Sequence, residues 1–112
     1  MRVVNVRGGA RMCVPDALDS ATAYVLLEQE DWFEDEIRFV RRWLRPGMHA
    51  VDVGANAGIY TASMAGAVGP QGRVWAYEPG PRSADLLQAM LEANRFDRVV
   101  PASRSPSAFR VW

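Results

Sequence analysis

The 112-residue sequence has no lysine, one cysteine, one histidine and no excess of charge of either sign. The absence of lysine excludes a nucleotide-binding loop that ends in Gly-Lys-Ser or Gly-Lys-Thr. The lone Cys13 cannot form an internal disulfide, and a single histidine and cysteine give no support for a metal site. Because 13 basic and 13 acidic residues cancel, no overall field favours nucleic acid or an anionic membrane as a partner.

Long apolar runs are also lacking. The longest uncharged stretch is Val53 to Gly72. It is rich in glycine and contains Pro70, so it is not apolar enough for a membrane-spanning helix. The first ten residues are interrupted by Arg2, Asn5 and Arg7, so they lack the continuous apolar core of a signal peptide. We therefore expect a cytoplasmic protein without a membrane partner.

The composition, 49% hydrophobic and 23% charged, is typical of a folded domain. A chain of this length hides roughly 65% of its unfolded surface on folding, which allows one core and excludes two. We divide the chain into an N-terminal hairpin with a connecting segment at 1–30, an α/β region at 31–101 and a tail at 102–112.

Two short β-favouring runs open the chain. Val3 to Arg7 and Arg11 to Val14 flank Gly8-Gly9, and paired glycines supply the positive φ angles of a tight turn. We therefore predict an N-terminal β-hairpin. The apolar stretch at 20–27 that follows is compatible with a strand or a short helix.

An amphipathic helix comes next. Asp31 and Glu34 form a capping box at its start, and Pro46-Gly47 ends it. The apolar stripe recurs at helical spacing and consists of Phe33, Ile37, Val40 and Leu44. We interpret the arginines late in this helix as a solvated face, and the tryptophans at 32, 43 and 75 as core anchors.

The pattern of strand, tight turn and helix then occurs twice. The first strand covers His49 to Val53, with its helix from about Ile59 to Val68. The second covers Val74 to Tyr77, with its helix after Pro79-Gly80-Pro81, and a third strand is expected near 97–101. This alternation predicts an α/β fold, a partial doubly wound (Rossmann-like) parallel sheet with flanking helices, preceded by the hairpin.

The string from Val51 to Gly58 lies where a strand meets its helix, and doubly wound sheets place ligands there. Gly54 lets the backbone turn sharply beside a ligand, and Gly58 lets the helix start close to the strand. Unpaired amides of the first helical turn favour an anionic group. Glu78 ends the next strand at the same edge, and its two oxygens suit the hydroxyls of a ribose. These features predict a nucleoside pocket.

The glycine spacing distinguishes between nucleosides. A dinucleotide-binding fingerprint requires glycines at relative positions one, three and six, which here are Gly54, Asn56 and Ile59. Two of the three positions, Asn56 and Ile59, do not carry the required glycine. The sequence therefore disfavours NAD and a nucleotide-dependent oxidoreductase.

An acid followed by small residues at alternate positions resembles the first motif of class I S-adenosylmethionine-dependent methyltransferases, here Asp52, Gly54, Asn56 and Gly58. A longer pattern resembles the FkbM family of methyltransferases more closely. It consists of the segment VDVGANAGIYT, the segment GPQGRVWAYEPGP and a helix that ends in Asn94. The upstream segments Trp32-Phe33-Glu34 and Leu44-Arg45-Pro46-Gly47 resemble the same family. The likeness covers roughly residues 14–100.

The resemblance implies S-adenosyl-L-methionine as cofactor, and the residue content of the sequence gives no support for a metal. Asp52 would lie near the ammonium of the methionine end, Glu78 would hold the ribose hydroxyls, and Pro79 would shape the loop beside the adenine. The complete implied set is Asp52, Gly54, Ala55, Asn56, Gly58, Glu78 and Pro79. In the family, Asn56 is the usual residue at its position.

The resemblance also implies that 31–101 is the N-terminal half of a longer methyltransferase domain. The first strand of such a sheet is central, so the strand at 50–53 would here have an open, apolar edge. The tail at 102–112 is rich in Ser, Arg and Pro, unlike the continuation in the family. We therefore expect a truncated chain that folds poorly, binds cofactor weakly and does not turn over.

Two functions remain open at this level. One is methyl transfer from S-adenosylmethionine to an oxygen of a small-molecule acceptor, a sugar or secondary metabolite. The alternative is an inactive remnant or nucleoside-binding module without catalysis. No catalytic base can be named, because His49 lies at the start of its strand, away from the glycine turn.

Overall fold

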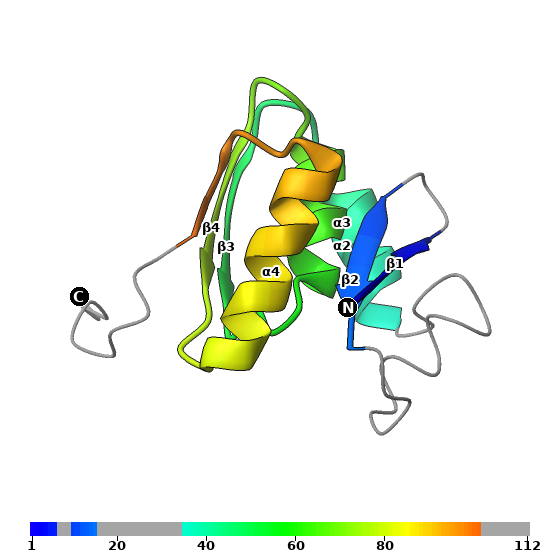
Figure 1. Ribbon diagram of the computed structural model, residues 1–112. Helices are drawn as coiled ribbons and strands as arrows, with labels where there is room; N and C mark the ends of the chain where they lie inside the picture. Colours follow the sequence, from blue (N-terminus) through cyan, green and yellow to red (C-terminus); the bar gives the residue numbers. More distant parts are fainter. Residues whose placement is uncertain (7–9, 16–34, 102–112) are drawn as a thin grey trace.

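The computed structural model describes residues 1–6, 10–15 and 35–101 (Figure 1). Its strands are β1 (Arg2–Asn5), β2 (Arg11–Val14), β3 (His49–Val53), β4 (Arg73–Tyr77) and β5 (Val99–Pro101). Its helices are α2 (Asp35–Trp43), α3 (Ile59–Val68) and α4 (Pro81–Asn94). The predicted α/β fold with a leading hairpin is confirmed, while Gly8-Gly9 and the Asp31 capping box lie outside the described residues.

The strands from β3 to β5 form a parallel sheet in the order β3-β4-β5. Asp52 of β3 is level with Ala76 of β4, and Val53 is level with Tyr77. On the other side of β4, Val74 is level with Val99. Because β3 and β4 are parallel and in register, their carboxyl ends meet at one edge, which brings the loop after β3 next to Glu78.

The helices α3 and α4 cover the same face of this sheet (Figure 1). Two right-handed crossovers that add strands in one direction place both helices on one side. The strand residues that face them are buried, with Val74 at 1% and Ala76 at 0% exposed. On the opposite face, Val51 and Val53 are 56% and 64% exposed.

The edge of β3 is open, as predicted from the sequence. Among the described residues, β3 pairs only with β4. Its outward-facing Val51 and Val53 carry no charge that would oppose pairing with another strand. Proteins normally cover or charge such an edge, because its unpaired backbone groups are a template for association.

The hairpin of β1 and β2 packs on α4 and forms a separate two-stranded antiparallel sheet. Met12, Cys13 and Val14 of β2 are buried in the same cluster as Leu87 and Met90 of α4. Cys13 is therefore a small core residue, and burial raises the pKa of its thiol.

Asn94, the last residue of α4, joins the hairpin to the rest of the fold. Its Oδ1 accepts a hydrogen bond from the backbone N–H of Arg11 at 2.6 Å, and its Nδ2 donates to the Arg11 carbonyl at 2.6 Å. The same Nδ2 donates to the carbonyl of Met90 at 2.8 Å. One side chain therefore both caps the end of α4 and ties it to β2.

The tryptophan prediction was wrong at position 43. Ile37 is the fully buried residue of α2, whereas Trp43 is 65% exposed and stacks on Phe39 with ring centroids 5.7 Å apart. Phe39 and Trp43 are four residues apart, so they share a helix face that the described chain does not cover. Trp75 is half-buried on the open face of the sheet. No helix within the described ranges is long and apolar enough to cross a membrane.

Candidate cofactor-binding site

The loop between β3 and α3 has positive φ angles at alternate residues. Gly54, Asn56 and Gly58 have φ values of 74°, 53° and 96°. Glycine adopts this left-handed region without steric cost, and asparagine tolerates it better than most residues. Small residues therefore alternate in this part of the sequence because the backbone has a positive φ at every second position. Asn56 is a suitable non-glycine residue for the middle one.

The loop is fixed against the end of β4 by backbone hydrogen bonds. The N–H groups of Gly54 and Ala55 both donate to the carbonyl of Tyr77, at 2.8 and 2.9 Å. Ala55 is buried at 5% exposure, and Asn56 is exposed. A Cβ built on Gly54 would have no neighbour within 4 Å, so the space beside this residue is open to a ligand, as predicted.

Glu78 connects the loop to the segment after β4. Its Oε2 accepts a hydrogen bond from the Asn56 N–H at 2.7 Å, and its Oε1 accepts one from the Gly80 N–H at 2.6 Å. The glycine turn and the Glu78 carboxylate thus lie on the same rim of the sheet. The negative charge expected beside the loop amides is supplied, at least at Asn56, by this carboxylate. Pro79 follows it and is exposed.

Asp52 is the buried charge of the site. It is 8% exposed and lies on the helix side of β3, where its Oδ2 accepts a hydrogen bond from the Thr61 hydroxyl at 2.6 Å. Burial raises the pKa of the Asp52 carboxyl, and the nearby Glu78 carboxylate raises it too, whereas hydrogen bonds from the side chain and backbone of Thr61 lower this pKa. Sequence reasoning missed Thr61, although it is the last residue of the quoted string VDVGANAGIYT.

The raised pKa of Asp52 gives a prediction for stability. A carboxyl that holds its proton more tightly in the folded state than in the unfolded state costs stability as pH rises through its folded pKa. We expect the free energy of unfolding of the wild type to fall relative to that of Asp52→Asn between about pH 4 and pH 7. Urea titrations of both proteins at several pH values measure the difference. A difference that stays constant, or changes in the other direction, contradicts the assignment.

Gly58 makes a closer contact than the sequence indicated. The prediction was that glycine lets the helix start close to the strand. In the structure, a Cβ at Gly58 would lie 2.4 Å from Cε of Met90 and 2.8 Å from Cδ1 of Leu87. A side chain at position 58 would therefore displace the buried ends of Met90 and Leu87, and the positive φ of this residue independently favours glycine.

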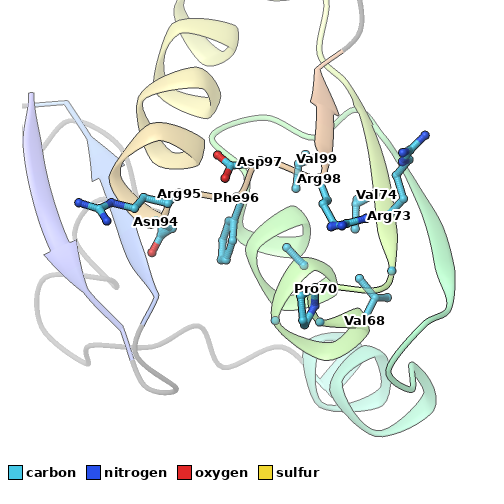
Figure 2. A pocket seen from close by; sticks show the side chains of 14 residues that line it. Val68, Pro70, Arg73, Val74, Asn94, Arg95, Phe96, Asp97, Arg98 and Val99 are labelled. Atoms are coloured by element: carbon cyan, nitrogen blue, oxygen red, sulfur yellow. The ribbon is translucent and has the colours of Figure 1, made fainter.

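A pocket of about 430 Å³ lies at the other end of the sheet (Figure 2). It is bounded by the loop between α3 and β4 and by the loop between α4 and β5, and it includes none of the predicted site residues. Figure 2 shows the side chains of Arg73 and Arg95 pointing away from it. Open α/β sheets bind ligands at the carboxyl ends of their strands, so this pocket at the amino ends is not the expected cofactor site.

Neither a metal site nor a catalytic base is evident within the described ranges. They contain no cluster of three metal-ligating His, Cys, Asp or Glu side chains. His49 lies at the start of β3, where it contacts the Trp75 ring edge-on at 5.6 Å between centroids, so it is far along the strand from the glycine turn.

Comparison with known proteins gives matches to methyltransferases. No protein-family model matches the sequence. The protein-L-isoaspartate O-methyltransferase of Triticum aestivum is 44% identical over 45 residues, which are 40% of this chain and 20% of that protein. The chain therefore spans a fifth of the length of this relative.

Solved structures resemble more of the chain. Pyrococcus horikoshii TYW2, described in complex with MeSAdo, has a TM-score of 0.67 at 20% identity, over 96% of this chain and 38% of its own. An S-adenosylmethionine-dependent O-methyltransferase of Thermotoga maritima has a TM-score of 0.60 at 22% identity, over 95% and 41%. These likenesses show that the chain shares the fold of both structures, and it spans about two fifths of the length of each.

Proposed function

We propose that this chain binds S-adenosyl-L-methionine at the carboxyl ends of β3 and β4, as part of a cytoplasmic methyltransferase of the FkbM type. The observation that carries the proposal is the hydrogen bond from the Asn56 N–H to the Glu78 carboxylate. It brings a small-residue turn and an acid together at the edge where this fold binds nucleosides. The likeness to an S-adenosylmethionine-dependent O-methyltransferase and to a structure that holds MeSAdo supports the same choice.

The Glu78 carboxylate has the acceptor capacity that a ribose requires. Each carboxylate oxygen offers about two acceptor positions, and the Asn56 and Gly80 amides use one on each oxygen. One position on each oxygen remains for the two ribose hydroxyls. The two amides also fix the rotamer of Glu78, so little side-chain entropy is lost on binding.

The remaining predicted residues surround this contact. Gly54 leaves open space for the sulfonium end of the cofactor, and Asp52 supplies a carboxylate for its ammonium group. The backbone of Ala55, Asn56 and Gly58 forms the wall of the turn. Pro79, exposed beside Glu78, would border the adenine.

The proposed reaction transfers the methyl group to an oxygen of a sugar or secondary-metabolite hydroxyl. The bond from sulfur to the methyl carbon breaks as the bond from oxygen to carbon forms, and the acceptor loses its proton. Catalysis of such a displacement comes mainly from holding oxygen, carbon and sulfur in line. The acceptor hydroxyl is inferred from the FkbM resemblance, and the complete methyl transfer is a proposal, since the chain spans about two fifths or less of the proteins it resembles.

Calorimetric titration tests the cofactor assignment. We expect S-adenosylmethionine and S-adenosylhomocysteine to bind the 112-residue chain saturably but more weakly than micromolar, because no described strand pairs with the open edge of β3, and NADH not to bind. Micromolar binding would show that high affinity does not require a further strand at this edge. A saturable signal from NADH alone, measured by saturation-transfer NMR, would remove the methyltransferase assignment.

A nucleoside-binding role without catalysis is the second candidate. It is favoured by the described site itself, which has carboxylates and amides for a cofactor but no side chain placed to accept the proton of an acceptor hydroxyl. Incubation with methyl-labelled S-adenosylmethionine and a panel of sugars distinguishes the two candidates. Cofactor binding without labelled product supports the second.

A further inference from the structure

Thr61 is the partner of the one buried carboxylate in the site. It belongs to the first turn of α3, is 0% exposed, and donates its hydroxyl to Oδ2 of Asp52 at 2.6 Å. Its backbone N–H also donates to Asp52. The N-cap residue Gly58 has no side chain to cap this helix. Asp52 therefore acts as the cap from the neighbouring strand, and it is held by two donors of one residue.

Within the described ranges, the groups that act on the Asp52 carboxylate besides Thr61 do not compensate for its charge. The sequence of α3 contains no charged residue, and the part of α4 that approaches Gly58 presents Met90 and Leu87. The charged group that acts on Asp52 from the end of β4 is Glu78, which is also negative. A second negative charge and burial both oppose ionisation, so the donors of Thr61 are what keeps an anion at this place.

We propose that Thr61 is a positioning residue, which holds the Asp52 carboxylate ionised and oriented for the ammonium group at the methionine end of the cofactor. The inference rests on the proposed binding of S-adenosylmethionine. Two donors from Thr61 use two of the about four acceptor positions of a carboxylate, and an ammonium group has three N–H donors for the others. A charge-assisted contact of this kind requires the anion to be in place before the ligand arrives.

The experiment compares two ligands that differ only at the methionine end. S-adenosylhomocysteine carries the amino-acid group, whereas methylthioadenosine keeps the nucleoside and lacks the ammonium. Thr61→Val removes the hydroxyl and nearly keeps the shape, Thr61→Ser restores a hydroxyl, and Ser63→Ala removes a hydroxyl from a half-buried position on the same helix. Affinities of the full 112-residue chain are measured by calorimetry between about pH 5 and pH 8.

We expect Thr61→Val to weaken S-adenosylhomocysteine about tenfold at neutral pH and to leave methylthioadenosine within about twofold. Because affinity requires ionised Asp52, it falls as pH falls, and in Thr61→Val this fall should begin at a higher pH. Thr61→Ser should restore the wild-type profile, and Ser63→Ala should match the wild type for both ligands.

The outcomes distinguish failure of the positioning role of Thr61 from failure of cofactor binding. Equal losses for both ligands, or an unchanged pH profile, would show that Thr61 only joins α3 to β3, and would overturn its positioning role while leaving cofactor binding intact. If the wild type binds neither ligand, the proposed function itself fails, and the role of Thr61 fails with it. Urea titration of each variant shows whether the folded state is retained.

Discussion

Replacement of Glu78 with alanine is expected to weaken S-adenosylmethionine binding by at least 100-fold. The carboxylate would make two charge-assisted hydrogen bonds to the ribose, and each is worth about 1.5–3 kcal/mol. The same change leaves the Asn56 and Gly80 amides without their partner, so the loop after β3 is held by its backbone hydrogen bonds to Tyr77 without the contact at Asn56. Because water can reach these exposed and half-buried groups, the loss of stability should be only about 1 kcal/mol.

The matched control is Glu92→Ala. Glu92 is a carboxylate on the exposed side of α4, where it accepts a hydrogen bond from Gln88 at 3.0 Å. Its replacement removes the same charge from the chain at a position outside the predicted site. Calorimetry with S-adenosylhomocysteine should give the wild-type affinity for this variant. If Glu78→Ala binds as tightly as Glu92→Ala does, the ribose assignment is wrong.

The substitution Gly58→Ala is expected to lower the free energy of unfolding by about 2–5 kcal/mol. Part of the loss is the left-handed backbone at φ 96°, which costs a residue with a Cβ about 1–2 kcal/mol. The rest is overpacking of about 1–3 kcal/mol, because the new methyl group would overlap Met90 and Leu87. The free energy of unfolding from urea titration measures the sum.

Gly66→Ala is the matched control for this change. Gly66 lies within α3, and a Cβ built there has no neighbour within 4 Å. Alanine in a helix interior is more favourable than glycine, so this variant should gain roughly 0.5–1 kcal/mol. Opposite signs at two glycines eight residues apart would support the described packing. A Gly58→Ala variant as stable as the wild type would show that α4 does not approach the loop.

The sequence predicted the place of the site better than its internal contacts. Strand ends followed by small residues are local patterns, so the loop after β3 and the acid after β4 could be located from the order of residues alone. The contact of Gly58 with Met90 joins segments 32 residues apart, and no local pattern encodes it. The spacing alone did not explain why asparagine follows Gly54 at the middle position of the turn. The positive φ of Asn56 explains it, because asparagine tolerates this backbone conformation.

The two helices differ in how well their sequences predict the buried side. The helix α3 is composed almost entirely of small and apolar residues, so its sequence does not indicate that Thr61 faces the sheet while Gly66 faces outward. In α2 the predicted apolar stripe is the buried side, since Ile37 is 0% exposed and Val40 and Leu44 are half-buried. Trp43 lies outside that stripe and is exposed, so the expectation that it anchors the core followed from its residue type and not from periodicity.

The order of the strands has a consequence for how this chain folds during synthesis. Each strand of the parallel sheet pairs with the strand made just before it, so the sheet can grow as the chain leaves the ribosome. The hairpin is different, because Arg11 must wait for Asn94, which is 83 residues later. Closing a loop of that length has the larger entropic cost, so the hairpin can dock on α4 only after the residues between them have been made.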